Sequence, residues 1–436
     1  MSTAATATNF SQDAFDAFLA ARDEPAWCLN WRRQAWEAFQ QLDWPNRSDE
    51  EWMRTDIRTF RLDKFHLPEG APTAPALPPA LLSEGVELAG HTASLNSRSI
   101  ESVLDKKYAD KGVIFCSLGQ AVTDHGDLVK NYLGRAVDYS YDRFAALNAA
   151  CFSGGSFLYV PRGVVVDQPL HALSALGDGA TDLGRTLVIL EDGAEATLLT
   201  ELKSIDEDST GLHCGSIELM VSAGANLRFV NLQDWSHKTW HFAHQRALVG
   251  RDASLQWTLG ALGSKLAKVN QHVELIGEGA RSQVNGVMFT EGKQHLSYHT
   301  LQHHRAPHTN SDFLYKAALQ DNSRTVWRGM IKVDPDAQKT DGYQRNDNLL
   351  LSPTARADSI PGLEIEADDV RCTHGSTSGR VDEEQIFYCQ SRGFTRKEAA
   401  RAIVAGFFQQ IFDRINIESV RESLSLAVAR KVREYE

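Results

Sequence analysis

The chain has 436 residues, of which 42% are hydrophobic, and a formal net charge of −12 at pH 7. This length can bury a large core, and the acidic balance argues against a general nucleic-acid or anionic-membrane binder, because both need a broad basic surface. A local basic patch remains compatible with this balance. The polar N-terminus lacks a signal-peptide pattern, and no apolar run approaches the ~20 residues of a membrane span, so we expect a cytoplasmic protein.

The first 67 residues predict an N-terminal helical domain. Phe15, Phe18 and Leu19 recur at helical spacing after Ser11, a candidate N-cap. Ser48 followed by Glu51 has capping-box form and predicts a further helix. Residues 68–80 are rich in proline and predict an exposed linker, and residues 81–150 mix strand-like and helical pieces, which predicts a mixed α/β lead-in to the core.

Residues 151–379 predict the core, because short β-branched runs there end repeatedly at a Gly or Asp corner. The corners are about 27 to 32 residues apart, with one longer gap that fits a degenerate coil near Thr309. They are Gly163, Gly193, Gly224, Asp252, Gly279, Asp336 and Asp368. One long period with one preferred corner favours a mainly β protein built on a right-handed parallel β-helix. An antiparallel sandwich would explain the strands and turns but not the period.

Two potential metal ligands lie near the end of this core. Apolar and acidic residues alternate from Leu363 to Glu366, which predicts a half-buried strand, and a second extended run follows from Val370. If that run is extended, Cys372 and His374 share a face with their Cα atoms roughly 6.6 Å apart. A thiolate and an imidazole suit iron, zinc or copper(I), although such a site needs about four ligands. Alternatively, Cys372 is a small buried hydrophobe and His374 a turn residue.

Residues 380–436 predict a C-terminal helical domain. Asp382 with Gln385 and Thr395 with Glu398 have capping-box form, and Gly393 fits the C′ position of the first helix. The second helix carries an apolar stripe from Ile403 to Ile415 that three short helices cannot bury alone. This stripe is expected to cover the end of the solenoid or to receive a partner.

The sequence contains no recognised nucleotide-binding or hydrolytic motif. The nearest approach to a phosphate-binding loop, from Gly286 to Lys293, has the wrong spacing, so we expect no nucleotide site in this chain. Histidines four residues apart on a strand lie about 13 Å apart, too far for one ion. We therefore expect the histidines of two segments to form exposed ladders along the solenoid or to be hydrogen-bonded core residues. They are His237, His241 and His244, and His295, His299, His303, His304 and His308. Most of the six scattered cysteines are expected to be reduced core residues.

Several stretches together resemble one known family. They are DDVRCTHGST with the following DEEQIFY and SRG, EEWMRTDI, FAALNAACFSGG, YVPRGVVVDQPL and AQKTDGYQRNDNLLLS. These stretches resemble the SufB/SufD family of scaffold subunits of the SUF iron-sulfur cluster assembly system, and the C-T-H-G segment is closer to the SufD type than to SufB.

The resemblance implies a β-helix core flanked by helical domains and a noncatalytic scaffold function. It implies a transient iron-sulfur cluster shared with a SufB-like sister subunit, with His374 as first candidate ligand, Cys372 as second, and a cysteine of the sister subunit completing the site. It also implies that a SufC-like ABC-type ATPase docks on the C-terminal helices, and that the isolated chain can form a homodimer. The residues expected to bind that ATPase are Phe387, Ile403, Phe407, Phe408 and Ile411.

Two other classes of function stay open from the sequence. A β-helix carbohydrate-active enzyme would need a groove lined by carboxylates and aromatic residues on the solenoid. A stand-alone metal-binding protein would use the histidine-rich segments and would carry stoichiometric metal.

Overall fold

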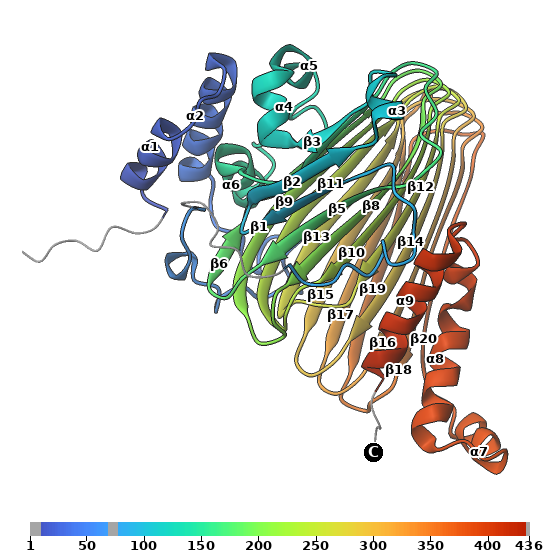
Figure 1. Cartoon of the computed structure of the whole chain (residues 1–436). Helices are drawn as coiled ribbons and strands as arrows, with labels where there is room; N and C mark the ends of the chain where they lie inside the picture. The colour runs from blue at the N-terminus through green and yellow to red at the C-terminus, as the bar shows by residue number, and fades with distance from the viewer. Residues whose placement is uncertain (1–9, 69–76, 433–436) are drawn as a thin grey trace, which may run out of the picture.

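The computed structural model describes residues 10–68 and 77–432. Its central feature is a parallel β-solenoid in which two long sheets face each other, with helices before and after it in the chain (Figure 1). The prediction of a mainly β protein with a parallel β-helix core between helical segments is confirmed. Within these residues, no helix combines the length and the apolar composition needed to cross a membrane.

The two sheets, which we call sheet A and sheet B, alternate along the chain. Sheet A contains, in spatial order, β2 (Arg98–Leu104), β1 (Gly90–Leu95), β5 (Leu170–Leu176), β8 (Glu195–Ser204), β10 (Asn226–Asp234), β12 (Ser254–Ala261), β14 (Arg281–Thr290), β16 (Asn310–Leu319), β18 (Asp341–Leu350) and β20 (Arg371–Arg380). Sheet B contains β19 (Arg356–Ile365), β17 (Arg324–Val333), β15 (His295–His304), β13 (Leu266–Leu275), β11 (Lys238–Val249), β9 (Thr210–Val221), β7 (Arg185–Leu190), β4 (Ser156–Val160) and β3 (Ile114–Ser117), and β6 (Ala180–Asp182) pairs with β9.

Helices precede and follow the solenoid in the sequence. They are α1 (Gln12–Ala20), α2 (Ala26–Gln41), the 3₁₀ turn η1 (Leu62–Lys64), α3 (Lys106–Ala109), α4 (Leu118–Asp124), α5 (Gly126–Lys130), α6 (Arg143–Cys151), α7 (Glu383–Ser391), α8 (Arg396–Phe412) and α9 (Glu418–Lys431). The predicted caps at Ser11 and Thr395 are confirmed, the latter as a full capping box with Glu398.

The helix predicted from Ser48 and Glu51 is wrong. The segment forms consecutive turns, in which the Trp52 N–H donates to the carbonyl of Asp49 and the Thr55 N–H to that of Trp52. Asn46 Oδ1 accepts from the Ser48 N–H at 2.8 Å, so a local side-chain turn competes with the helix start.

The corners of the solenoid form one hydrogen-bonded ladder. Seven residues 27 to 31 positions apart have positive φ: Gly163, Gly193, Gly224, Asp252, Gly279, His308 and Lys339. The N–H of each donates to a carbonyl of the next coil, for example Gly163 to Asp192 at 2.9 Å and His308 to Gln338 at 2.9 Å. The first five predicted corners are confirmed. His308 is the corner of the degenerate coil, Lys339 replaces the predicted Asp336, and Asp368 does not have positive φ.

The inner faces of the sheets form the main core, and the N-terminal helices cover the outer face of sheet B. There Leu212, Trp240 and Phe242 pack with Phe60 and Phe144. The phenyl rings of Phe144 and Phe242 stack with their centroids 3.9 Å apart. The aromatic residues near the N-terminus therefore include anchors that hold the helical segment on the solenoid.

The C-terminal helices α8 and α9 pack against the outer face of sheet A and not over the end of the solenoid. Val404, Phe408 and Ile411 share a buried cluster with Val230 and Leu314. This corrects the expectation of a terminal cap. The reason is that outward-facing apolar side chains on sheet A need cover, and the helical stripe supplies it.

The region between the first helices and the solenoid supplies strands to both sheets. β1 pairs in parallel with β5, and β3 pairs antiparallel with β4. Residues 69–76, most of the linker predicted at 68–80, lie outside the described residues. The domain boundaries at 67, 80, 150 and 379 stay predictions.

Candidate functional site at the open end of the solenoid

The solenoid ends at β19 and β20, which together form what we call the open end. In the described part of the chain, β19 pairs only with β17 and β20 only with β18, so each sheet finishes in an unpaired backbone edge. Leu363 and Ile365 on β19 are 39% and 36% exposed, whereas Ile331 and Val333, aligned with them one coil earlier, are fully buried. Apolar positions that are interior in the preceding coil therefore face solvent at this end.

Both predicted metal ligands lie on β20 at this open end. The register places Cys372 beside Gly342 and His374 beside Gln344. Cys372 is half-buried against the cluster of Ile331 and Val333, and His374 is exposed. Because alternate residues of a strand share a face, the thiol and the imidazole project to the same side, as predicted from their spacing.

A glycine makes room for the thiol. A Cβ on Gly342 would lie 3.3 Å from Cys372 Sγ and 3.4 Å from His304 Nε2. His304 itself is committed to the core, since its ring nitrogens bond the hydroxyls of Thr309 at 2.7 Å and Ser311 at 2.9 Å. Burial lowers the pKa of His304 to about 3, so this imidazole is neutral and both of its nitrogens are already bonded.

Burial raises the pKa of the Cys372 thiol, and the nearby Asp341 carboxylate raises it further, while a hydrogen bond from the Gly342 backbone lowers it in part. At neutral pH the side chain is a thiol, and binding of a metal would have to displace its proton. The donor set suits iron, but the described residues contain no group of three or more His, Cys, Asp or Glu side chains able to hold a metal ion. Further ligands would have to come from another chain.

Gln344 lies directly beneath His374 and contains an unsatisfied buried atom. Its Nε2 donates to the carbonyl of Gly362 at 2.9 Å, but its buried Oε1 has no hydrogen-bond partner. A buried acceptor without a donor is costly, and this oxygen lies inside the solenoid against Gly329, whose Cβ, if present, would approach it to 2.4 Å. Sequence reasoning missed Gly342 and Gln344, although the coil period of about 30 residues points back to them from Cys372 and His374.

The five residues predicted to bind an ATPase partner differ widely in exposure. Phe387 on α7 is 72% exposed, Ile403 and Phe407 are half-buried, and Phe408 and Ile411 are fully buried against sheet A. In this conformation only Phe387 presents a large free surface. Its role in partner binding stays a prediction.

Two further aromatic side chains accompany Phe387. Tyr388 is 60% exposed and Phe394 is 47% exposed, and both border the turn between α7 and α8. The turn is formed at Gly393, whose φ of 94° confirms the predicted C′ position. We refer to these three exposed rings as the aromatic patch, and the FYCQSRGF sequence around Gly393 is the signal that would have found them.

Two histidines of the first histidine-rich segment, His241 and His244, are buried and hydrogen-bonded. His241 Nδ1 lies 2.7 Å from His213 Nδ1 inside the solenoid, and His244 Nε2 lies 2.9 Å from Asp142 Oδ1 outside it. Burial lowers the pKa of His213 to about 3 and that of His241 well below its usual range, so both rings are neutral. The expectation of hydrogen-bonded core histidines is confirmed for His241 and His244.

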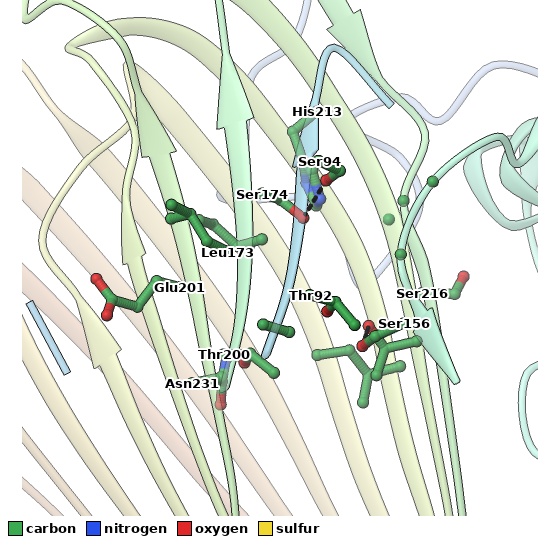
Figure 2. Close-up of a pocket in the computed structure, with 18 of the residues that line it drawn as sticks. Thr92, Ser94, Ser156, Leu173, Ser174, Thr200, Glu201, His213, Ser216 and Asn231 are labelled. Carbon is green, nitrogen blue, oxygen red and sulfur yellow. Dashed lines mark hydrogen bonds between the residues drawn. The ribbon is translucent and has the colours of Figure 1, made fainter. Parts of the chain in front are cut away.

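Figure 2 shows a cavity between the sheets near the other end of the solenoid, where Ser174, Thr200 and Asn231 of sheet A lie across from Ser156 and His213 of sheet B. Its volume is about 40 Å³. The amide nitrogen of Asn231, which lines it, is buried without a partner. The space suits a few ordered water molecules, because organic ligands need several hundred Å³.

Sequence comparisons agree with this architecture. The profile of the SufBD protein N-terminal region matches residues 17–172, and that of the SUF system FeS cluster assembly SufBD core domain matches residues 173–407. The chain belongs to the SufBD family. The core match includes β20 and therefore Cys372 and His374.

Relatives of this SufBD protein extend over nearly its whole length. An iron-sulfur cluster assembly SufBD family protein of Staphylococcus saprophyticus is 28% identical over 422 residues, which are 91% of this chain and 88% of the relative. Proteins with the same family description from Staphylococcus haemolyticus and Staphylococcus aureus are 28% and 27% identical with the same coverage. The coarse part of the sequence prediction, a SufBD protein of iron-sulfur cluster assembly, is confirmed.

Proposed function

We propose that this SufBD protein is a SufD-type, noncatalytic scaffold subunit that assembles iron-sulfur clusters in the cytoplasm at an interface with a SufB-like sister subunit. The open end carries this proposal. Three features lie together there: two unpaired strand edges, the exposed apolar residues Leu363 and Ile365, whose counterparts one coil earlier are interior, and a thiol beside an imidazole. A second solenoid placed against this end would pair the edges and cover the apolar residues.

The nascent cluster is cargo of this interface. His374 is exposed and available as a ligand, and Cys372 becomes a ligand only after losing the proton that burial favours. Iron-sulfur clusters take about four protein ligands, of which this chain supplies one or two. A cysteine of the SufB-like subunit completes the set in this proposal.

A SufC-like ABC-type ATPase supplies nucleotide hydrolysis, because this sequence contains no phosphate-binding loop. In this proposal its docking surface consists of the exposed Phe387, Tyr388 and Phe394 and extends along α8 to the half-buried Ile403 and Phe407. Phe408 and Ile411 hold α8 on sheet A, so a movement of the ATPase against α7 and α8 would be transmitted to the solenoid. Without its partners the chain is free to form a homodimer through the same open end.

The assembly is tested by purifying the tagged chain anaerobically from its own cytosol and weighing the complexes by native mass spectrometry. We expect a SufB-like subunit and an ABC-type ATPase to be recovered with it. Recovery of the chain alone, or only as a homodimer, would contradict the proposal.

The ligand assignment is tested with His374→Ala. We expect the complex to form normally, because the side chain is exposed, while iron and sulfide per complex fall by about tenfold or more, a loss that even an outer-shell metal-site residue can cause. His125→Ala, an exposed histidine next to α5, is the matched control and should leave the yield unchanged. An unchanged yield in His374→Ala would refute the assignment.

A further inference from the structure

A basic cleft lies beside β6, at the edge of sheet B where β9, β11, β13 and β15 begin. Its volume is about 570 Å³, and the N-terminal segment around η1 lines it together with these turns. No carboxylate is among its lining residues in the part of the chain that the structure describes, although the chain as a whole carries a net charge of −12. Five of the lining side chains are cationic, namely Arg61, Lys64, Lys238, Lys265 and Lys293.

Four of these five cations have no carboxylate within ion-pair distance among the described residues. Lys238 pairs with Asp208 at 2.8 Å. Within residues 10–68 and 77–432, none of the other four forms an ion pair with a carboxylate at 4 Å or less. Like charges gathered in one cleft repel one another, and an anion of several charges would relieve that repulsion.

The fold sets the spacing of the cations. Lys238, Lys265 and Lys293 precede or open three consecutive strands, β11, β13 and β15, which lie side by side in sheet B. Neighbouring strands are about 4.8 Å apart, so the three lysine positions span about 10 Å. Lys265 Nζ is also held 4.9 Å from the ring centroid of Trp240.

Arg61 adds a positioned guanidinium from the N-terminal segment. Its Nη1 donates to the carbonyls of Arg58 at 2.8 Å and Phe60 at 2.9 Å, which fixes the side chain and leaves its other donors free for a ligand. Arginine and lysine are the side chains that recognise phosphate groups, arginine by a planar fork and lysine as a point charge.

We propose that this basic cleft binds a small molecule through a diphosphate or longer phosphate chain. The cleft is larger than a single phosphate needs and falls within the range of small-molecule sites. The row of lysine positions suits a chain of two or three linked phosphates better than one compact ion. This inference does not depend on the scaffold function, because the cleft shares no residue with the open end.

The test is isothermal titration calorimetry of the full chain at low ionic strength, with inorganic pyrophosphate and ADP as probes. We expect both to bind, and Lys265→Gln combined with Lys293→Gln to weaken the affinity at least tenfold. Tighter binding of ADP identifies a nucleotide-like ligand, and equal binding identifies the diphosphate group alone.

The matched control is Lys106→Gln combined with Lys130→Gln, which removes the same charge from two exposed lysines outside the cleft. Its affinity should equal that of the unchanged chain. An equal loss in the control would show that net charge alone attracts the probes, and would overturn the proposal. Absence of binding to the unchanged chain, or equally tight binding of a hexaglutamate peptide, would also overturn it.

Discussion

The two ends of the solenoid are finished in opposite ways. At the N-terminal end, β2 and β3 run antiparallel to their neighbours, and Tyr108 and Phe115 are 0% and 4% exposed. At the open end the last strands stay parallel, and Leu363 and Ile365 are more than one-third exposed. The chain closes its own core at one end and leaves it exposed at the other, and this difference is the basis for proposing an interface at the open end.

Buried charge distinguishes the two ends as well. Near the closed end, the Arg185 guanidinium pairs with the Glu218 carboxylate at 2.5 Å, with both side chains fully buried. Glu218 also accepts the N–H groups of Gly134, Ala136 and Val137. At the open end, the pair of Arg371 with Asp341 is exposed, with 78% of the arginine side chain accessible.

The largest effect is expected when the buried pair is broken. Arg185→Met leaves the Glu218 carboxylate buried without a counter-charge, so the free energy of unfolding should fall by about 3–5 kcal/mol. Arg371→Met, the matched control at the open end, should change it by less than about 1 kcal/mol. Urea unfolding measures both, and equal losses would show that the two ends do not differ in buried charge.

A pH-dependent effect is expected from Asp182, also near the closed end. Ser97 Oγ donates to Asp182 Oδ1 at 2.7 Å, but Oδ2 has no partner, and burial raises the pKa of this carboxyl to about 6. Between pH 3.8 and about 6 the unfolded chain loses this proton and the folded chain keeps it, so stability falls as pH rises through this window.

Asp182→Asn removes that dependence. At pH 7 the variant should be more stable than the unchanged chain by about 3 kcal/mol, and the difference should shrink as the pH falls toward 4. Unfolding free energies measured from pH 4 to 8 test this. Parallel curves for the two proteins would contradict the assignment of the titration to Asp182.

These features were not equally accessible from the sequence. The corners could be predicted, because a positive φ favours Gly and Asp locally and each coil needs such a residue at the same place. Gly163, Gly193 and Gly224 are examples. The shared face of Cys372 and His374 follows from strand alternation alone. At Lys339 the local signal failed, since Asp336 three residues earlier offers an equally good turn residue.

Long-range packing accounts for what was missed. Whether Phe408 and Ile411 meet a partner or sheet A depends on outward-facing residues such as Val230 and Leu314, far away in sequence. The alternation of Leu363 and Ile365 with acidic residues predicted that they lie on a strand. It did not predict that this strand belongs to the last described coil and is left uncovered. The exposure of these two residues depends on where the solenoid ends and not on their local sequence.

A smaller change, in the free energy of association, is expected when a charged residue is placed at the open end. Leu363→Lys should weaken association with the SufB-like subunit at least tenfold, about 1.4 kcal/mol, because an interior-facing apolar contact is replaced by an ion that must be desolvated. The free energy of unfolding should barely change, since this side chain is already exposed. Val103→Lys, on the terminal strand β2 at the closed end with 45% exposure, is the matched control and should bind normally. Equal binding by both variants would remove the functional distinction between the ends.

The smallest effect concerns the corner ladder that connects the two ends. His308 has φ 58° at a corner where four of the five earlier coils have glycine. A left-handed conformation costs a residue with a side chain about 1–2 kcal/mol, and glycine's extra unfolded-state freedom costs about 0.5–1 kcal/mol. His308→Gly should therefore stabilise the fold by about 0.5 kcal/mol.

Gly193→Ala is the reverse test. A Cβ there would have room, since the nearest atom, Gly163 Cα, lies at 4.0 Å. The variant should therefore destabilise the fold by a similar amount through φ alone. If calorimetric unfolding shows shifts of the same sign for both variants, backbone conformation does not decide the residue at these corners.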